Sequence, residues 1–154
     1  MRLDGVSLVI SARPKSEDVL SGQVGVEWNH GAVREPDAAV LRENNRNPVI
    51  AVIPAKLTLS LRVLTADNNE AFHASVSVGA LFNQHFGLKA TDERVALEGN
   101  ELARLVLPLA NREMKNLLFR ADLPPAKIPG DLLFSDDPAA KMPEGFERLN
   151  TPSS

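Results

Sequence analysis

The feature that most constrains the fold is a pair of alternating runs separated by a short polar turn. In the first run, between Lys56 and Val63, every second residue is Leu or Val and the intervening residues are polar or charged. The second run, between Phe72 and Phe82, sets Phe, Ala and Val against His, Ser and Gly. Side chains of a strand point alternately to opposite faces, and the turn Asp67-Asn68-Asn69 favours a tight reversal. The sequence therefore predicts an antiparallel hairpin with one buried and one solvated face.

A helix is predicted after the hairpin, between Glu101 and Ala121, because apolar residues recur there every three or four positions. The apolar stripe contains Leu102, Leu105, Val106, Leu109, Met114, Leu117, Leu118 and Ala121, and the polar stripe contains Glu101, Arg104, Asn111, Arg112 and Lys115. Asn100 is expected to be the N-cap. Pro108 lacks a backbone donor, so the helix is expected to kink there or to consist of two segments. An α+β fold follows, with the helix covering the apolar face of the sheet.

The N-terminal third of the chain predicts two further strands. Short alternating runs occur at Val6–Ile10 and at Val24–Trp28. Between Asn29 and Pro48 the pattern fades, so we expect a long connection with one helical turn around Ala38–Leu41.

Three further expectations concern the segments around the hairpin and the helix. The apolar run Val49–Ile53 is expected to lead into the hairpin, with Pro54 at a bulge or bend. Leu88–Thr91 is expected to form a short return strand. Residues 135–154, rich in proline and acidic residues, are expected to form an irregular, partly mobile tail. The candidate docking residues of this tail are Phe146 and Leu149.

Composition excludes several classes of function. The chain has 154 residues and a net charge of -3, which argues against binding to duplex nucleic acid. Without cysteine there is no thiolate nucleophile and no disulfide. The longest apolar run, Val49–Ala55, is far shorter than the roughly 20 residues of a membrane span, and Met1–Ile10 lacks the features of a secretion signal. We therefore expect a soluble, cytoplasmic protein of one globular domain.

No catalytic or metal-binding constellation is found in the sequence. His30, His73 and His85 have neither metal-ligand spacing nor a neighbouring nucleophile motif. His73 is expected to be a solvated residue on the polar face of its strand, and His85 to cap a turn at a strand end. No glycine-rich phosphate loop is present. We therefore expect no cofactor, no metal and no enzymatic activity, which favours a protein that acts by binding.

The order of several short motifs resembles SecB, the ATP-independent export chaperone, over roughly Leu57 to Phe134. The hairpin contributes Leu61-Arg62-Val63, Ala71-Phe72 and the strand end Gly79-Ala80-Leu81-Phe82. In the helix, Leu107-Pro108-Leu109-Ala110-Asn111-Arg112-Glu113 is similar to the family's Phe-Pro-Tyr-Ala-Arg-Glu signature with one extra residue. Leu123-Pro124-Pro125 and Pro129-Gly130-Asp131-Leu132-Leu133-Phe134 resemble its crossover segment.

The resemblance implies a fold and a function. The fold would be a four-stranded antiparallel sheet with a long helix on one face, occupying residues 1–134, in a homo-oligomer (a dimer or a dimer of dimers) with the helices at the inner interface. The function would be that of a holdase, whose apolar grooves bind unfolded or partner polypeptides. The candidate lining residues are Trp28, Val40, Leu41, Ile50, Val52, Leu132, Leu133 and Phe134. For each of them, packing in the core is the alternative role.

The sequence departs from the family in two places, and both bear on the expected function. The sheet face that docks the translocase ATPase SecA in the family carries His73 and Ser75 here, so SecA docking is not expected. The segment Ser135-Asp136-Asp137-Pro138 interrupts the family's second helix. Both departures favour a chaperone dedicated to one client, as in the antitoxin-associated branch of the family. The alternative is a non-catalytic structural or assembly subunit that uses the same fold as an interaction module.

Overall fold

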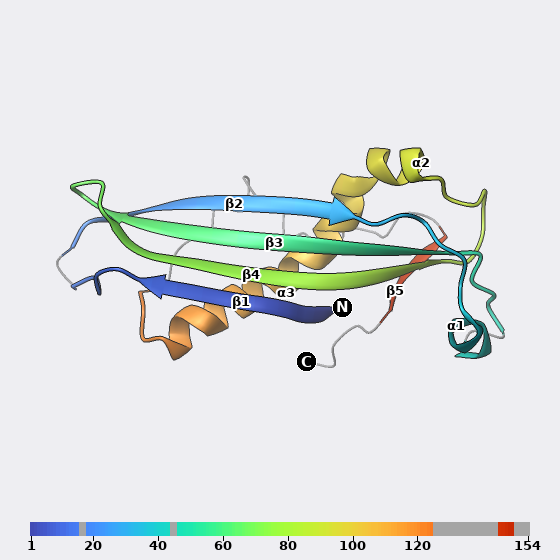
Figure 1. Ribbon diagram of the computed structural model, residues 1–154, viewed down its shortest axis with the longest axis horizontal. Helices are drawn as coiled ribbons and strands as arrows, with labels where there is room; N and C mark the ends of the chain where they lie inside the picture. The colour runs from blue at the N-terminus through green and yellow to red at the C-terminus, as the bar shows by residue number, and fades with distance from the viewer. Residues whose placement is uncertain (16–17, 44–45, 125–144, 150–154) are drawn as a thin grey trace.

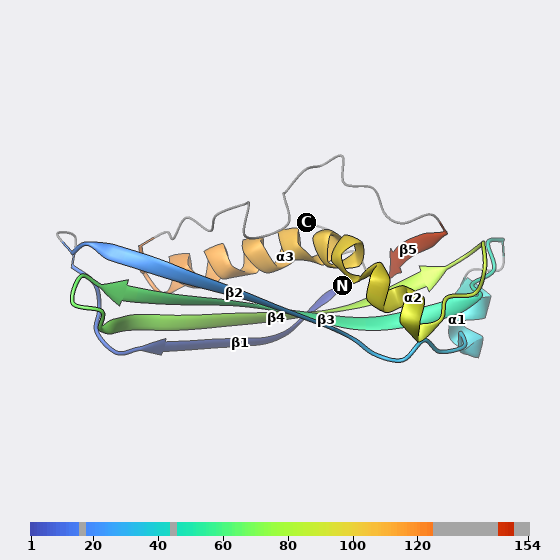
Figure 2. The same cartoon turned by 90° about the horizontal axis from the view of Figure 1, so that it is seen from above.

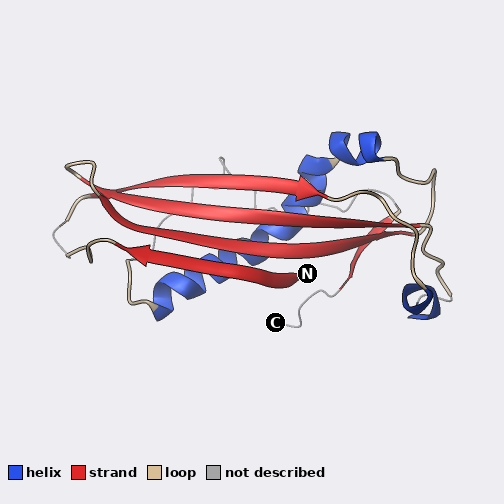
Figure 3. Ribbon diagram, viewed as in Figure 1, coloured by secondary structure: helices blue, strands red, loops and turns tan. Residues whose placement is uncertain are grey.

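The computed structural model describes residues 1–15, 18–43, 46–124 and 145–149. It has the α+β architecture expected from the sequence, with one antiparallel sheet and a long helix across one of its faces (Figure 1, Figure 2). The strands are β1 (Arg2–Ile10), β2 (Leu20–His30), β3 (Ala51–Thr65), β4 (Glu70–Gln84) and β5 (Phe146–Leu149), and the helices are α1 (Ala38–Glu43), α2 (Asp92–Leu97) and α3 (Gly99–Arg120). Figure 3 shows the two short helices toward the end of the sheet where β3 begins, and α3 along its length.

The strand order is β1-β4-β3-β2, and β5 pairs with part of the outer edge of β4. The four strands expected from the sequence are thus present and β5 is a fifth. The prediction of an irregular tail is wrong for Phe146–Leu149, because β4 supplies a sheet edge that the tail sequence alone does not reveal. Residues 135–144 and 150–154 of that tail lie outside the described part of the chain. The domain boundary at residue 134 stays a prediction.

The central hairpin of β3 and β4 confirms the alternating pattern. Leu57, Leu59, Leu61 and Val63 of β3 and Phe72, Ala74, Val76, Val78, Ala80 and Phe82 of β4 are all buried. Asn68 adopts a positive φ of 61° in the connecting turn, a conformation that asparagine tolerates better than most residues. The amide of Thr65 donates to the carbonyl of Asn69 at 2.8 Å and closes the turn. This hairpin provides most of one face of the core.

Pro54 lies inside β3, and the expectation of a bulge or bend there is wrong. Its pairing with Leu81 of β4 is in register, and the register shift of this hairpin lies between Val63 and Leu64. The carbonyl of Pro54 accepts from the amide of Gly31 at 2.7 Å, so its backbone faces β2 where β2 ends. A residue's N–H and C=O point to the same side of a strand. An N–H at position 54 would point beyond the last residue of β2. Proline, which has no N–H, is therefore tolerated there.

The outer strands β1 and β2 differ in how α3 covers them. Trp28 of β2 pairs with Leu57, and Val6 of β1 pairs with Val76, so both side chains belong to the α3 side of the sheet. α3 packs on β2, β3 and β4. Val6 and Leu3 of β1 therefore stay 48% and 43% exposed.

The helical segment starts earlier than the sequence predicts. Thr91 caps the short helix α2, since its hydroxyl accepts from the amide of Arg94 at 3.3 Å. α3 follows directly, with Glu98 as its N-cap residue, so the expectation of an N-cap at Asn100 is wrong. Asn100 lies inside the first turn because α2 and α3 share Glu98 at their junction.

α3 runs through Pro108 as one helix, so the alternative of two segments is wrong. Pro108 lies on the exposed side, where its ring displaces no core side chain. The apolar stripe is buried as predicted except at Leu117 and Ala121, which are half-buried. Asn111, expected on the polar stripe, is only 9% exposed. Half of the residues of α3 are buried, so the buried side of the helix is wider than one amphipathic stripe. Asn111 lies on this buried side. None of the described helices is long and apolar enough to cross a membrane.

Candidate functional site

Three connections meet at the end of the sheet where β3 begins and β4 ends. They are the segment from β2 to β3, which contains α1, the segment from β4 to α2, and Gly145, which directly precedes β5 (Figure 1). The amide of Ile50 donates to the carbonyl of Gln84 at 2.7 Å, and the amide of Arg34 donates to the carbonyl of Val52 at 2.9 Å. These bonds hold the first connection against β3 and β4.

The side chain of Gln84 organises the connection from β4 to α2. Its Nε2 donates to the carbonyls of Phe86 and Leu88 at 3.1 and 2.6 Å, and its Oε1 accepts from the amide of Ala90 at 2.8 Å. A return strand at Leu88–Thr91 would need backbone hydrogen bonds to a neighbouring strand. Here the side chain of Gln84 bonds to this segment instead. That strand is absent from the described chain, so its prediction is wrong.

Replacing Gln84 by leucine is expected to lower the free energy of unfolding by about 2–3 kcal/mol, because the buried amide of Ala90 loses its acceptor. Urea denaturation followed by circular dichroism measures the change. The matched control is Gln23→Leu on the exposed side of β2, which should change stability by less than about 0.5 kcal/mol. Equal losses in the two variants would contradict the role assigned to the Gln84 side chain.

His85 joins the same end of β4 to two other segments. Its Nδ1 lies 3.0 Å from the carbonyl oxygen of Asn47, and its Nε2 lies 2.7 Å from Oε1 of Glu147 in β5. The Nε2 contact is close enough for an ion pair with a protonated ring, but it is outside hydrogen-bond geometry. The sequence expects His85 to cap a turn, whereas in the structure it bridges two segments from a largely buried position.

Around these anchors, three large apolar side chains are exposed, and we call them the end patch. Leu41 of α1 is 45% exposed, and Phe86 and Leu88 of the connection after β4 are 53% and 80% exposed. The half-buried Val40 and Ile50 belong to the same end of the sheet. Exposed large apolar side chains on neighbouring segments are typical of an interaction surface.

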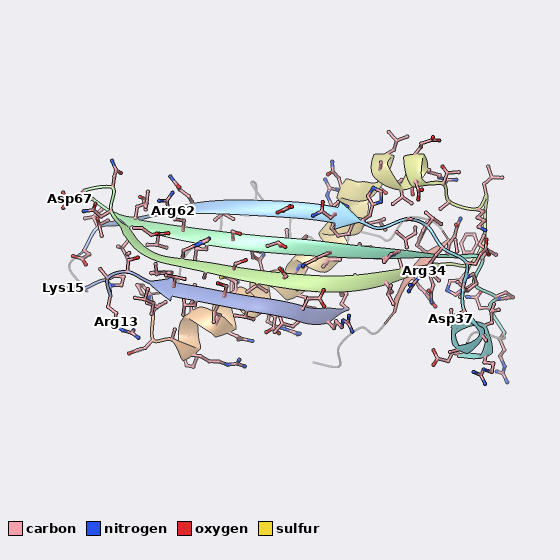
Figure 4. All side chains as sticks on the ribbon, in the orientation of Figure 1. Arg13, Lys15, Arg34, Asp37, Arg62 and Asp67 are labelled. Atoms are coloured by element: carbon pink, nitrogen blue, oxygen red, sulfur yellow. The ribbon has the colours of Figure 1, made fainter. Side chains whose placement is uncertain are left out.

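α1 is positioned by Asp37, whose carboxylate accepts from the amide of Val40 at 2.9 Å, the usual geometry of an N-cap. Figure 4 shows Asp37 and Arg34 beside α1, far from Arg13, Lys15, Arg62 and Asp67 at the opposite end of the sheet. Nearby, Lys89 forms an ion pair with Glu35 and links the connection after β4 to the segment before α1. The end patch is therefore bordered by charged groups.

Four of the eight residues that the sequence assigns to a client groove lie at this end of the sheet. Val40 and Leu41 belong to α1, Ile50 precedes β3, and Val52 lies in β3. Val52 is 2% exposed and pairs with Asn83 on the sheet face opposite α3. Leu132, Leu133 and Phe134 are not among the described residues. The role of these residues in binding a client stays a prediction.

Trp28 lies on the other face of the sheet, against the start of α3. Its ring contacts Phe82 edge to face, with centroids 6.4 Å apart and planes at 61°. A side chain at Gly99 would place its Cβ 3.1 Å from the indole nitrogen, so glycine allows α3 to begin close to this ring. Trp28 is half-buried in these contacts and does not join Leu41 on one surface.

Sequence reasoning missed Phe86 and Leu88, whereas the expected docking of Phe146 is confirmed, since it is buried in the core. Phe86-Gly87-Leu88 follows the last alternating position of the hairpin, so no periodic pattern assigns these residues to a face. The exposed His73 confirms the expectation of a solvated histidine. Within the described ranges, no three His, Asp or Glu side chains are arranged to hold a metal ion.

No protein-family model and no curated protein sequence matches this chain. Among solved structures, the chain is similar to the Mycobacterium tuberculosis SecB-like chaperone Rv1957, determined in complex with a ChAD peptide from the Rv1956 HigA1 antitoxin. The two share 19% sequence identity and a TM-score of 0.63, and the alignment covers 82% of this chain and 83% of the other. At this identity the likeness establishes the fold. The resemblance carried by the sequence motifs is thus confirmed, since the chain has the fold of a SecB-like chaperone.

Proposed function

We propose that the protein is an ATP-independent molecular chaperone, without enzymatic activity, that binds unfolded or partner polypeptides. The observation that carries this proposal is the SecB-like fold, because the similar chain of known structure is a chaperone in complex with an antitoxin peptide. A fold alone does not determine a function. The end patch adds support from this chain's own side chains, because a holdase needs exposed apolar surface that a client can cover.

The proposed mechanism uses no nucleotide. A client segment covers Leu41, Phe86 and Leu88 and removes their apolar surface from water, which is favourable at about 25 cal/mol per Å² buried. Because this term does not depend on direction, many client sequences can be held. The hydrogen bonds of Gln84 and His85 keep the patch in place, so little ordering is needed when a client binds.

The proposal includes a homo-oligomer, a cytoplasmic location and one dedicated client in place of general export. Self-association is supported by β1, whose outer edge pairs with no strand of the described chain. Leu3, Val6 and Val9 of β1 are also exposed. An unpaired apolar edge strand is a surface that proteins generally cover.

The proposal predicts that the protein suppresses the aggregation of a chemically unfolded client, followed by light scattering without nucleotide. Suppression is expected near stoichiometric amounts. In the double variant Phe86→Ser/Leu88→Ser we expect the amount needed for half-suppression to rise at least fivefold. The matched control is Phe119→Ser/Leu97→Ser, which changes the same residue types at positions 84% and 87% exposed but outside the end patch.

If the folded protein leaves aggregation unchanged, the chaperone proposal is wrong. A stable complex with one folded partner, together with indifference to unfolded chains, would instead favour the structural or assembly subunit. Equal effects of the two double variants would remove the end patch from the client site.

A further inference from the structure

Two different strands share the outer edge of β4. β1 pairs with β4 from Phe72 to Gly79, and β5 pairs with it from Leu81 to Gln84. The first partner is a strand of nine residues and the second a strand of only four. The end of β4 nearest the end patch is therefore closed by a short strand that is distant in the sequence.

The described contacts of this segment include those of Phe146 and of Gly145, which precedes the strand. Phe146 is 9% exposed and belongs to the main core, and the carbonyl of Gly145 accepts from the amide of His85 at 2.6 Å. Gly145 has a φ of +91°, and a Cβ there would lie 2.6 Å from the carbonyl oxygen of Phe86, so the position requires glycine. The carboxylate of Glu147 approaches His85 but is 45% exposed, which makes this pair weak.

Among the described strands, β5 pairs with β4 alone, over four positions. The pairs β1–β4, β2–β3 and β3–β4 do not involve it. Such local units open at much lower free energy than the whole domain.

We propose that the edge of β4 from Leu81 to Gln84 is a binding site for an extended client segment, and that β5 occupies this site until a client displaces it. The inference deepens the proposed chaperone function and rests on it. A sheet edge binds the backbone of any extended chain, and the core position of Phe146 adds a preference for an aromatic or large aliphatic residue. The client is therefore an unfolded segment with one such residue flanked by residues that favour strands.

The test locks β5 in place with a disulfide. Asn83 and Glu147 are partners across β4 and β5, and the chain contains no cysteine of its own. The variant Asn83→Cys/Glu147→Cys is titrated against fluorescent, reduced and carboxymethylated α-lactalbumin, a permanently unfolded protein, in its oxidised and reduced forms. We expect the oxidised form to bind at least tenfold more weakly. The control is Glu27→Cys/Thr58→Cys, which joins β2 to β3 away from the site and should bind equally in both forms.

A second variant tests the same inference in the opposite direction. Phe146→Ser weakens β5, so binding of the same unfolded protein should tighten at least threefold relative to the unmodified chain. Equal binding by the oxidised and reduced forms, with the disulfide confirmed by mass spectrometry, would overturn the inference and leave the chaperone function standing. Weaker binding by Phe146→Ser in a folded sample would overturn it as well. If no form binds the unfolded protein, the proposed function itself fails.

Discussion

Replacing Phe72 by alanine is expected to lower the free energy of unfolding by about 3–5 kcal/mol, because it removes a large ring from the packed core and leaves a cavity. Phe72 is 1% exposed and lies between Ile10 of β1 and Val63 of β3, its partners in the sheet. The lost ring therefore weakens the attachment of β1 as well as the hairpin. Urea denaturation, followed by the circular dichroism of the sheet, measures the loss.

The control for this variant is Phe119→Ala. It is the same substitution at a residue that is 84% exposed near the end of α3. Alanine is the better helix former and little burial is lost, so stability should change by less than about 0.5 kcal/mol. A loss above about 2 kcal/mol at Phe119 would mean that its ring is covered in solution, for example by a second copy of the chain.

The second large effect is expected from Val106→Asp in α3. Val106 is fully buried against the sheet, and aspartate has nearly the same size, so the substitution changes charge more than volume. Burying a carboxylate without a partner should cost about 4 kcal/mol or more. The melting temperature and the urea midpoint should both fall sharply, and a sample that does not fold at all agrees with the prediction.

Lys115→Asp is the matched control in the same helix. Lys115 is exposed, so aspartate there costs only its lower helix propensity and an unfavourable charge near the helix C-terminus, below about 1 kcal/mol together. Similar losses at positions 106 and 115 would mean that the buried face of α3 is assigned incorrectly.

The regular parts of this fold could be predicted because their signals are periodic. Leu57 to Val63 and Phe72 to Phe82 repeat every second residue, and a slip of one position would turn every apolar side chain to water. The buried side of α3 follows in the same way from its spacing of three and four. The helix boundaries follow less clearly from the sequence, since Asn100-Glu101 favours a helix start whereas Thr91 caps α2 and α3 begins at Gly99.

The candidate site could be predicted only in part, because most of it depends on contacts between distant segments. Val40, Leu41 and Val52 are grouped in one candidate groove only through the resemblance to the SecB family, and the structure places them at the same end of the sheet. The exposure of Phe86 and Leu88 depends on three hydrogen bonds of Gln84, a side chain at the end of an otherwise regular strand. The pairing of β5 depends on an edge that β1 leaves free. Neither contact has a signature in the local sequence.

The order of the strands has a consequence for the protein's synthesis. β1 leaves the ribosome before every other strand, yet its partner β4 is complete only when Gln84 has been added. β2 can pair with β3 earlier, since they are neighbours in both the chain and the sheet. Ile10 must wait for Phe72, more than sixty residues later, before it is paired. The strand that is made first is therefore the last of the four to be protected, and a ribosome that pauses before β4 leaves it open to aggregation.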